Sequence, residues 1–262
     1  MENLKEYRNN IIQDTDLRDY IYHRIKNDHF KFNKDEVVSQ FQLTKLFDEK
    51  RKGKRHHNPG DIGSCIRALY YAWKGAEIEQ TEEDIKQQDE AFAIGIKCHE
   101  MITELLKPIF PLKVENWTKN EDLNMLGRMD FEWCINGKWM PVEVKSCSAN
   151  SLKFKISRSI IDFNHYCQIQ SYMFMEDGQV IKSYPLGWLL FINKESCFDN
   201  NEEQMDWTLF KVLKDKECWQ YIQDKIMELE CYLVMDSVPP KPGDGLVSCK
   251  YCNYQSKCQE DE

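Results

Sequence analysis

The residues around Asn136 and Gly137 include two carboxylates that a tight turn would place opposite each other. Asn-Gly is the strongest short-range signal for a β-hairpin with a two-residue turn, and the register that this turn sets pairs Asp130 with Glu143. Directly opposed residues have Cβ atoms about 4.5–5.5 Å apart, so the two carboxylates repel each other unless a cation lies between them. Mg²⁺ and Mn²⁺ prefer oxygen ligands of this kind.

Lys145 follows Glu143 by two residues and therefore projects from the same face of the predicted strand, whereas Val144 projects into the core. Together Asp130, Glu143 and Lys145 provide the groups needed for metal-assisted hydrolysis of a phosphodiester. The carboxylates would hold the ion, and the lysine would position water or offset developing charge. The alternative is a surface hairpin with a Glu–Lys pair, and a register shift of one residue would turn one carboxylate to the opposite face.

A predicted helix over residues 91–106 supplies a third candidate ligand for the same ion. Its apolar positions recur at helical spacing and are Ile94, Met101, Ile102, Leu105 and Leu106. His99 shares a face with Gly95, and a glycine there lets another backbone, or the site itself, approach closely. His99 is therefore a candidate neutral-imidazole metal ligand. The alternative is a semi-buried histidine with satisfied hydrogen bonds.

Three of the eleven cysteines lie close together as Cys249-x2-Cys252-x5-Cys258, a spacing typical of a metal site. A tetrahedral zinc ion or a cubane iron–sulfur cluster needs a fourth ligand, and spacing alone does not separate these two centres. The candidates for that ligand are Cys65, Cys98, Cys134, Cys147, Cys167, Cys197, Cys218 and Cys231. Several fall in apolar patterns typical of buried small side chains, whereas Cys65 follows a glycine-containing loop at a predicted helix start.

The composition is that of one large globular domain in a reducing compartment. The 262 residues are 42% apolar and 12% aromatic. No apolar run reaches about 18 residues, and the first residues are charged, so we expect a cytoplasmic protein with no membrane contact. The net charge of −9 argues against non-specific coating of nucleic acid but leaves room for a local basic path. The best basic segment, residues 51–57, is more typical of a solvated linker.

The elements that must position these groups indicate an α/β fold. Helical spacing predicts helices over residues 17–25, 37–47, 91–106, 160–175 and 206–236, and one that is capped by Asp61 or Ser64 and runs through Trp73. Residues 51–63 are predicted as a loop, and residues 80–89 as a loop or an exposed helical start. Residues 123–147 predict the hairpin, and the apolar run 186–192 predicts a buried strand.

These motifs resemble the PD-(D/E)xK nuclease superfamily, and in particular its RecB-like branch with a four-cysteine iron–sulfur cluster. That branch includes CRISPR-associated adaptation exonucleases and the nuclease domain of AddB-type recombination proteins. The resemblance covers roughly residues 61–258 and rests on six motifs in the family's order. They are Cys65-Ile66-Arg67, Gly95-x3-His99, Gly127-x-x-Asp130, Glu143-Val144-Lys145, Gln168-x3-Tyr172 and the terminal cysteines.

The resemblance implies a restriction-endonuclease-like core, with a central mixed β-sheet flanked by helices, over residues 61–262. Residues 1–60 would form an N-terminal helical extension, and the C-terminal segment would bind the cluster. The implied ligands of Mn²⁺ or Mg²⁺ are His99, Asp130, Glu143 and the Val144 carbonyl, with Lys145 catalytic. Gln168 and Tyr172 would support the site or contact DNA. Cys65, Cys249, Cys252 and Cys258 would hold a structural 4Fe-4S cluster.

The implied activity is metal-dependent DNA hydrolysis by an exonuclease that prefers single strands or frayed ends. Such an enzyme would process DNA ends in recombination, phage DNA metabolism or CRISPR adaptation. The sequence contains no helicase motor, so DNA would be unwound by a partner or arrive single-stranded. A helicase- or integrase-type protein is the expected partner. The alternative is a non-catalytic iron–sulfur module that binds DNA or a protein partner.

Overall fold

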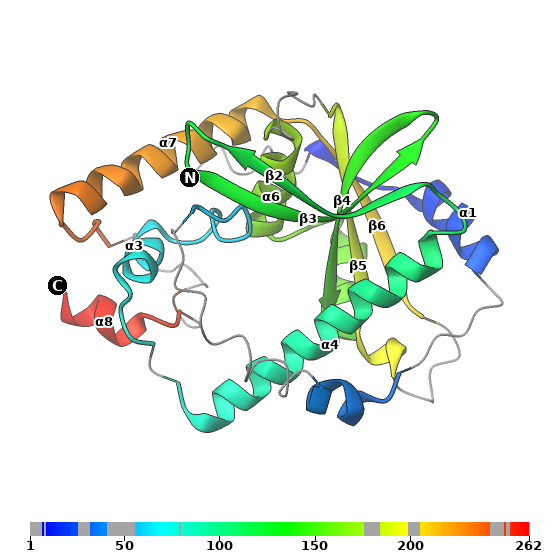
Figure 1. Cartoon of the computed structure of the whole chain (residues 1–262), viewed down its shortest axis with the longest axis horizontal. Coiled ribbons are helices and arrows are strands. Elements are labelled where there is room, and N and C mark those ends of the chain that lie inside the picture. Colours follow the sequence, from blue (N-terminus) through cyan, green and yellow to red (C-terminus); the bar gives the residue numbers. More distant parts are fainter. Residues whose placement is uncertain are drawn as a thin grey trace.

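One mixed β-sheet organises the part of the chain that the structure describes. The structure is a computed structural model, and it describes residues 7, 9–25, 32–40, 56–78, 80–175, 184–198, 205–241, 249 and 252–261. Within these ranges the strand order is β1-β6-β5-β4-β3-β2, with β4 and β5 parallel and the other neighbours antiparallel. Helices flank the sheet, which confirms the expected restriction-endonuclease-like architecture (Figure 1).

The strands are β1 (Ile11–Gln13), β2 (Leu112–Asn120), β3 (Met125–Ile135), β4 (Lys138–Cys147), β5 (Leu186–Asn193) and β6 (Trp207–Leu213). The helices are α1 (Thr15–Ile25), α3 (Ile66–Lys74), α4 (Glu82–Leu106), α5 (Ala149–Arg158), α6 (Phe163–Phe174), α7 (Lys216–Met235) and α8 (Gln255–Glu260). Residues 34–40 are also helical, and a short 3-10 helix, η2, spans Glu195–Cys197. No helix in the described ranges has the length and apolar character that crossing a membrane requires.

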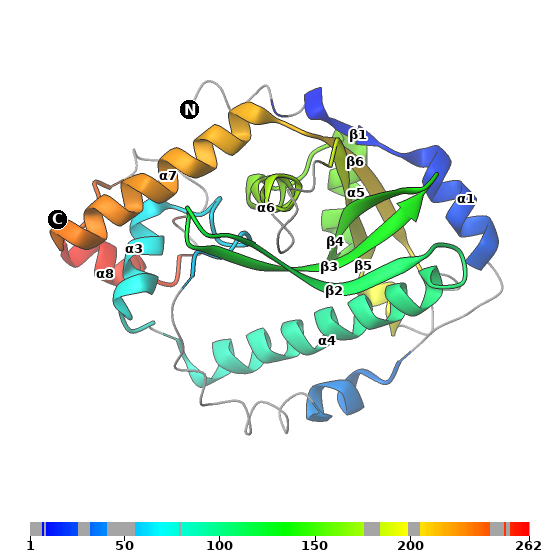
Figure 2. The same cartoon turned by 45° about the horizontal axis from the view of Figure 1, so that its top comes forward.

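Two apolar cores lie on opposite faces of the sheet. On one face, Ile102 of α4 and Ile21 of α1 are fully buried in the same cluster as Val144. On the other face, Ile169 of α6 and residues of α3 and α7 pack in a cluster with Leu189. Figure 2 shows the long helix α4 below the β2–β3 ribbon and α6 above it. The sheet therefore separates the helix that carries His99 from the helix that carries Gln168 and Tyr172.

The predicted hairpin and its register are confirmed. Ile135 pairs with Lys138, and the pairing continues in step to Phe131 opposite Val142. The turn residues Asn136 and Gly137 have φ values of 52° and 75°, as a two-residue hairpin turn requires. The predicted buried strand over 186–192 is also confirmed as β5, which pairs in parallel with β4.

The predicted helix over residues 206–236 is wrong in its first part. Residues Trp207–Leu213 form β6, which lies between β1 and β5 and is buried on both faces. A strand buried on both faces loses the alternation that separates it from a helix in sequence. The helix begins only after Asp215, whose side chain accepts hydrogen bonds from the backbone N–H groups of Glu217 and Cys218.

Other boundaries also differ from prediction. Cys65, rather than Asp61 or Ser64, is the N-cap of α3. Residues 80–89 are mostly the first turns of α4, which begins with a capping box between Thr81 and Asp84. The strands β1 and β2 were not predicted. Residues 41–47 of a predicted helix, and most of the basic segment (51–55), lie outside the described residues.

The edge strand β1 provides a matched pair of residues for a stability test. Ile11 is 6% exposed and packs in the core beside Val212 of β6, whereas its neighbour Ile12 is 44% exposed. Ile11→Ala should lower the free energy of unfolding in urea by about 2–4 kcal/mol because it leaves a cavity. Ile12→Ala should lower it by less than about 1 kcal/mol. Equal effects of the two substitutions would contradict the placement of β1 in the core.

Candidate active site

Asp130 lies at the point where the pairing of β3 with β4 stops. The last paired residues are Phe131 and Val142. At the next residue, the side chain of Asp130, rather than a backbone carbonyl of β3, accepts a hydrogen bond from β4. Its Oδ2 accepts a hydrogen bond from the Val144 N–H at 2.7 Å, and its Oδ1 lies 3.2 Å from Nδ1 of His99. A side chain from α4 thus reaches the hairpin carboxylate where the two strands separate.

Two glycines allow the close approaches on which this arrangement depends. A Cβ at Gly95 would lie 3.3 Å from Oγ of Ser146 on β4, so α4 packs tightly there and carries His99 to the sheet. A Cβ at Gly127 would lie 2.7 Å from Pro59 and 2.9 Å from the Tyr172 ring. Any larger residue at Gly127 would push α6 away from β3, and with it the hydroxyl of Tyr172.

Glu143 is the centre of a hydrogen-bond network on the α6 side of the sheet. Its Oε1 accepts hydrogen bonds at 2.7 Å from Nζ of Lys145 and at 2.7 Å from Nε2 of Gln168. The same amide lies 3.1 Å from the Tyr172 hydroxyl, which donates to the carbonyl of Arg128 at 3.1 Å. The network therefore fixes one oxygen of Glu143 and ties α6 to both strands of the hairpin.

The second oxygen of Glu143, Oε2, is buried and has no hydrogen-bond partner among the described residues. Glu143 as a whole is only 3% exposed. Burial, followed by the charge of Asp130, raises the pKa of Glu143 to about 7, although Lys145 opposes the shift. An unpartnered buried carboxylate oxygen beside a second carboxylate is an unfavourable arrangement that an added positive charge would relieve.

The two histidines near this network differ in their electrostatic surroundings. Burial opposes protonation of His99, but the hydrogen bond to Asp130 and the charge of Glu143 outweigh it and raise its pKa. Burial lowers the pKa of His165 on α6, and the charge of Lys145 lowers it further. Sequence analysis missed His165. Its spacing of three residues before Gln168, on one helical face, is the signal that could have found it.

The donor set of this site fits a divalent cation in its chemistry. The imidazole of His99 contacts the Asp130 carboxylate, and the charge of Asp130 acts on the Glu143 carboxylate. Among the described residues, Oε2 of Glu143 has no hydrogen-bond partner and is available to a cation. In the described ranges, however, no group of three or more His, Cys, Asp or Glu side chains has the spacing of an assembled metal site. Asp130 and Glu143 are instead bonded to His99, Lys145, Gln168 and the Val144 N–H.

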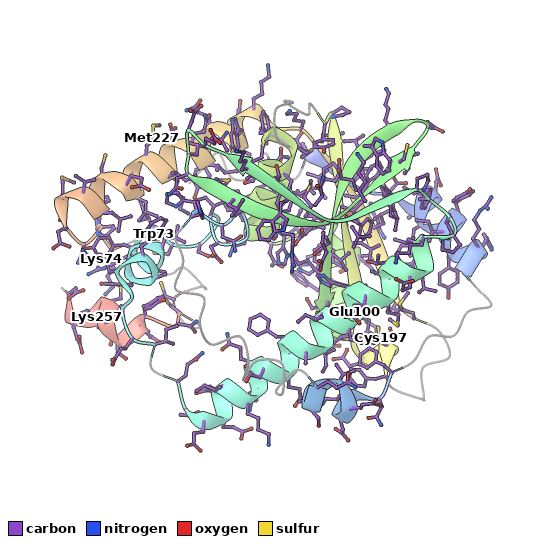
Figure 3. All side chains as sticks on the ribbon, viewed as in Figure 1. Trp73, Lys74, Glu100, Cys197, Met227 and Lys257 are labelled. Atoms are coloured by element: carbon purple, nitrogen blue, oxygen red, sulfur yellow. The ribbon has the colours of Figure 1, made fainter. Side chains whose placement is uncertain are left out.

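The predicted cluster cysteines lie at two segments that the fold brings together. Asp261, just after α8, accepts hydrogen bonds at 2.8 Å from both Arg67 and Tyr71 of α3. Figure 3 shows α3, with Trp73 and Lys74, beside α8, with Lys257. Cys65 begins α3 and Cys258 lies within α8, but the cysteines in the described ranges do not form an assembled metal site.

Comparison with known proteins finds similar structures but no matching family or curated protein. The crystal structure of SSO0001 is similar, with a TM-score of 0.52 and 17% identity over 87% of this chain and 96% of that one. An alkaline exonuclease from Laribacter hongkongensis, LHK-Exo, has a TM-score of 0.47 and 9% identity over 69% of this chain and 89% of that one. At 17% identity, the likeness to SSO0001 is one of fold alone.

The raised pKa of Glu143 predicts how stability depends on pH when no divalent cation is present. An acid with a raised folded-state pKa destabilises the fold as pH rises from its ordinary value of 4.5 to about 7. Glu143→Gln should therefore gain about 2–3 kcal/mol of stability relative to wild type between pH 5 and pH 8, measured by urea unfolding in EDTA. The exposed Glu104→Gln variant is the control. A difference that does not change with pH would contradict the burial of an uncompensated charge.

Proposed function

We propose that this chain is a metal-dependent DNA nuclease of the PD-(D/E)xK type. The observation that carries the proposal is the buried carboxylate of Glu143 near the charge of Asp130. One oxygen of this carboxylate accepts a hydrogen bond from Lys145, and the other has no hydrogen-bond partner among the described residues. Two carboxylates and a lysine placed together at the end of one hairpin are the groups that phosphodiester hydrolysis requires. A bound Mn²⁺ or Mg²⁺ would activate water and polarise the phosphate.

The residues around that ion would have different roles in binding and catalysis. The ion would be held by His99, Asp130, Glu143 and the Val144 carbonyl. The strongest candidate donor is Oε2 of Glu143, which has no hydrogen-bond partner among the described residues. The ammonium group of Lys145 would orient water and offset negative charge that develops on the phosphate. Gln168 and Tyr172 would keep Glu143 in place through the hydrogen bonds described above.

The proposed activity also has a substrate preference and a role in the cell. We infer a preference for single strands or frayed ends and a role in DNA end processing, as an exonuclease with a helicase- or integrase-type partner. The acidic net charge of −9 supports a localised rather than a general nucleic-acid surface. A cytoplasmic location of the protein is part of this proposal.

Substitution of the catalytic groups tests the proposed chemistry directly. Asp130→Asn and Lys145→Ala should each reduce cleavage of an end-labelled single-stranded DNA in Mn²⁺ by about a thousandfold or more, because each removes a charge needed in the transition state. Lys153→Ala, which changes an exposed lysine on the neighbouring helix α5, should leave the rate unchanged. EDTA should abolish cleavage by the wild-type protein.

Two results of this experiment would overturn the proposal. Undiminished cleavage by both active-site variants would show that another site, or another protein, acts on the DNA. A folded wild-type protein that binds DNA but cleaves neither DNA nor RNA in Mn²⁺ would favour the non-catalytic binding module.

We propose in addition that Cys65, Cys249, Cys252 and Cys258 bind a structural 4Fe-4S cluster. The cysteine spacing and the contact of α8 with α3 support this assignment, because that contact joins the segments that carry the first and the last of these cysteines. Such a cross-link would close a long loop and stabilise the fold over the nuclease core. The cluster takes no part in the proposed hydrolysis.

Metal content and thermal stability together test the cluster. Cys258→Ser should remove the absorbance near 400 nm and most of the iron and labile sulfide from anaerobically purified protein, and should lower its Tm. Cys231→Ser, which changes an exposed cysteine of α7 outside the motif, should do neither. Stoichiometric zinc in wild-type protein without iron would replace the cluster by a zinc site. Neither metal in wild-type protein would refute a metal centre.

A further inference from the structure

Glu115 of β2 has an unusual backbone conformation directly opposite Asp130 of β3. The flanking pairs are Val114 with Phe131 and Asn116 with Met129, so the register places Glu115 opposite Asp130. Its φ of 52° falls in the left-handed region, which is uncommon and costly for a long side chain inside a strand. Strained residues of this kind cluster at functional sites, where the surrounding structure holds them in place.

The Glu115 side chain is paired with an exposed arginine beside an exposed tryptophan. One oxygen of Glu115 lies 3.4 Å from Nη1 of Arg128, and the Arg128 guanidinium lies 5.8 Å from the centre of the Trp117 ring. Trp117 and Arg128 are directly paired across β2 and β3. Trp117 is 54% exposed, and the side chain of Arg128 is 51% exposed. We call Glu115, Trp117 and Arg128 the ribbon triad.

The ribbon triad lies on the same strand face as Asp130 and close to it. Arg128 precedes Asp130 by two residues, so both side chains project from one face of β3, about 6.6 Å apart along the strand. The opposite face of the ribbon at Gly127 packs against Pro59 and Tyr172 and is covered. The triad therefore borders the proposed site on its open side.

A second exposed row reaches the same point from α4. Phe92, Ile96 and His99 follow each other at helical spacing and share one face of α4. Phe92 is 55% exposed and Ile96 is 50% exposed, whereas His99 contacts Asp130. Exposed aromatic side chains thus lie on α4, which carries His99, and on β2, which pairs with the strand that carries Asp130.

From this geometry we infer that the ribbon triad binds an unpaired nucleic-acid strand next to the scissile phosphate. One base stacks on Trp117, and a backbone phosphate replaces the Glu115 carboxylate as the partner of Arg128. The inference deepens the proposed nuclease function and rests on it. It assigns the choice of unpaired over paired substrate to this triad, because a base within a duplex has no free face to offer Trp117.

The chemistry of the triad favours nucleic acid over a protein partner. Arginine binds phosphate through two parallel hydrogen bonds, and a carboxylate presents the same pair of oxygens. Glu115 therefore acts as a stand-in for phosphate in the free protein and keeps Arg128 beside Trp117. In a chain with a net charge of −9, a cation next to an exposed indole is suited to a ligand that is both anionic and aromatic.

Equilibrium binding of a labelled oligo-dT tests the triad without cleavage. The measurement uses fluorescence anisotropy over a series of salt concentrations, with the full chain carrying Lys145→Ala and with EDTA present. Trp117→Ala should weaken binding about tenfold, and Trp117→Phe should restore most of the affinity. Arg128→Ala should lower the slope of log affinity against log salt by about 0.7. Glu115→Gln should strengthen binding about two- to fivefold, because the competing carboxylate is lost.

An exposed aromatic–arginine pair on α1 supplies the matched control. Tyr20 is 46% exposed, and the Arg24 guanidinium lies 4.5 Å from its ring centre, so Tyr20→Ala removes a similar surface away from the site. This control should bind oligo-dT as the parent protein does. Substitutions at Trp117 and Arg128 that change neither affinity nor salt slope would overturn the inference and identify the triad as a surface for another ligand.

The result separates this inference from the proposed function. Cleavage that depends on Lys145, together with unchanged binding by the triad variants, would refute the triad and leave the nuclease standing. Weakened binding by Trp117→Ala in a protein that cleaves nothing would refute the nuclease function and leave the binding of a nucleic-acid strand by the triad standing. If the parent protein does not bind oligo-dT even at low salt, the triad inference is refuted whatever the cleavage assay shows.

Discussion

The burial of the Glu143 carboxylate is the interaction on which the rest of the site depends. Removing a charge from water is costly unless other groups compensate for it, and within the described ranges only one of the two oxygens accepts a hydrogen bond. Lys145 and Gln168 fix that oxygen, while Asp130 adds a second negative charge nearby. The fold thus maintains a local deficit of positive charge at one end of the hairpin, at the expense of its own stability.

The architecture of the sheet explains how residues from opposite faces meet at this point. α4 and α6 pack on different sides of the sheet, and each contributes a side chain to the hairpin carboxylates. Contact through an intact sheet would be blocked by the strands themselves. The pairing of β3 with β4 stops at Phe131, and Asp130 can therefore bond to His99 on one side and to the Val144 N–H on the other.

Sequence analysis predicted the hairpin well because its information is local. Asn136 and Gly137 specify a turn, and the turn sets the register of the residues that follow. The end of the strand pairing at Asp130 could not be predicted, because the Asp130 side chain bonds there to the Val144 N–H and to His99 of a distant helix, and such a contact leaves no local signal in the sequence. The same limit explains β6, whose residues are buried on both faces and lack the alternation of an ordinary strand.

The pairing of β1 with β6 has a consequence for how the protein is made. Ile11 and its partner Val212 lie 201 positions apart in the sequence (212 − 11), so the sheet is complete only after the whole stretch between them has been synthesised. Contacts of such long range slow folding because a large loop must close first. Until then the free edge of β6 can pair with a strand from another chain. The newly made protein is therefore most exposed to aggregation after β6 emerges and before β1 docks.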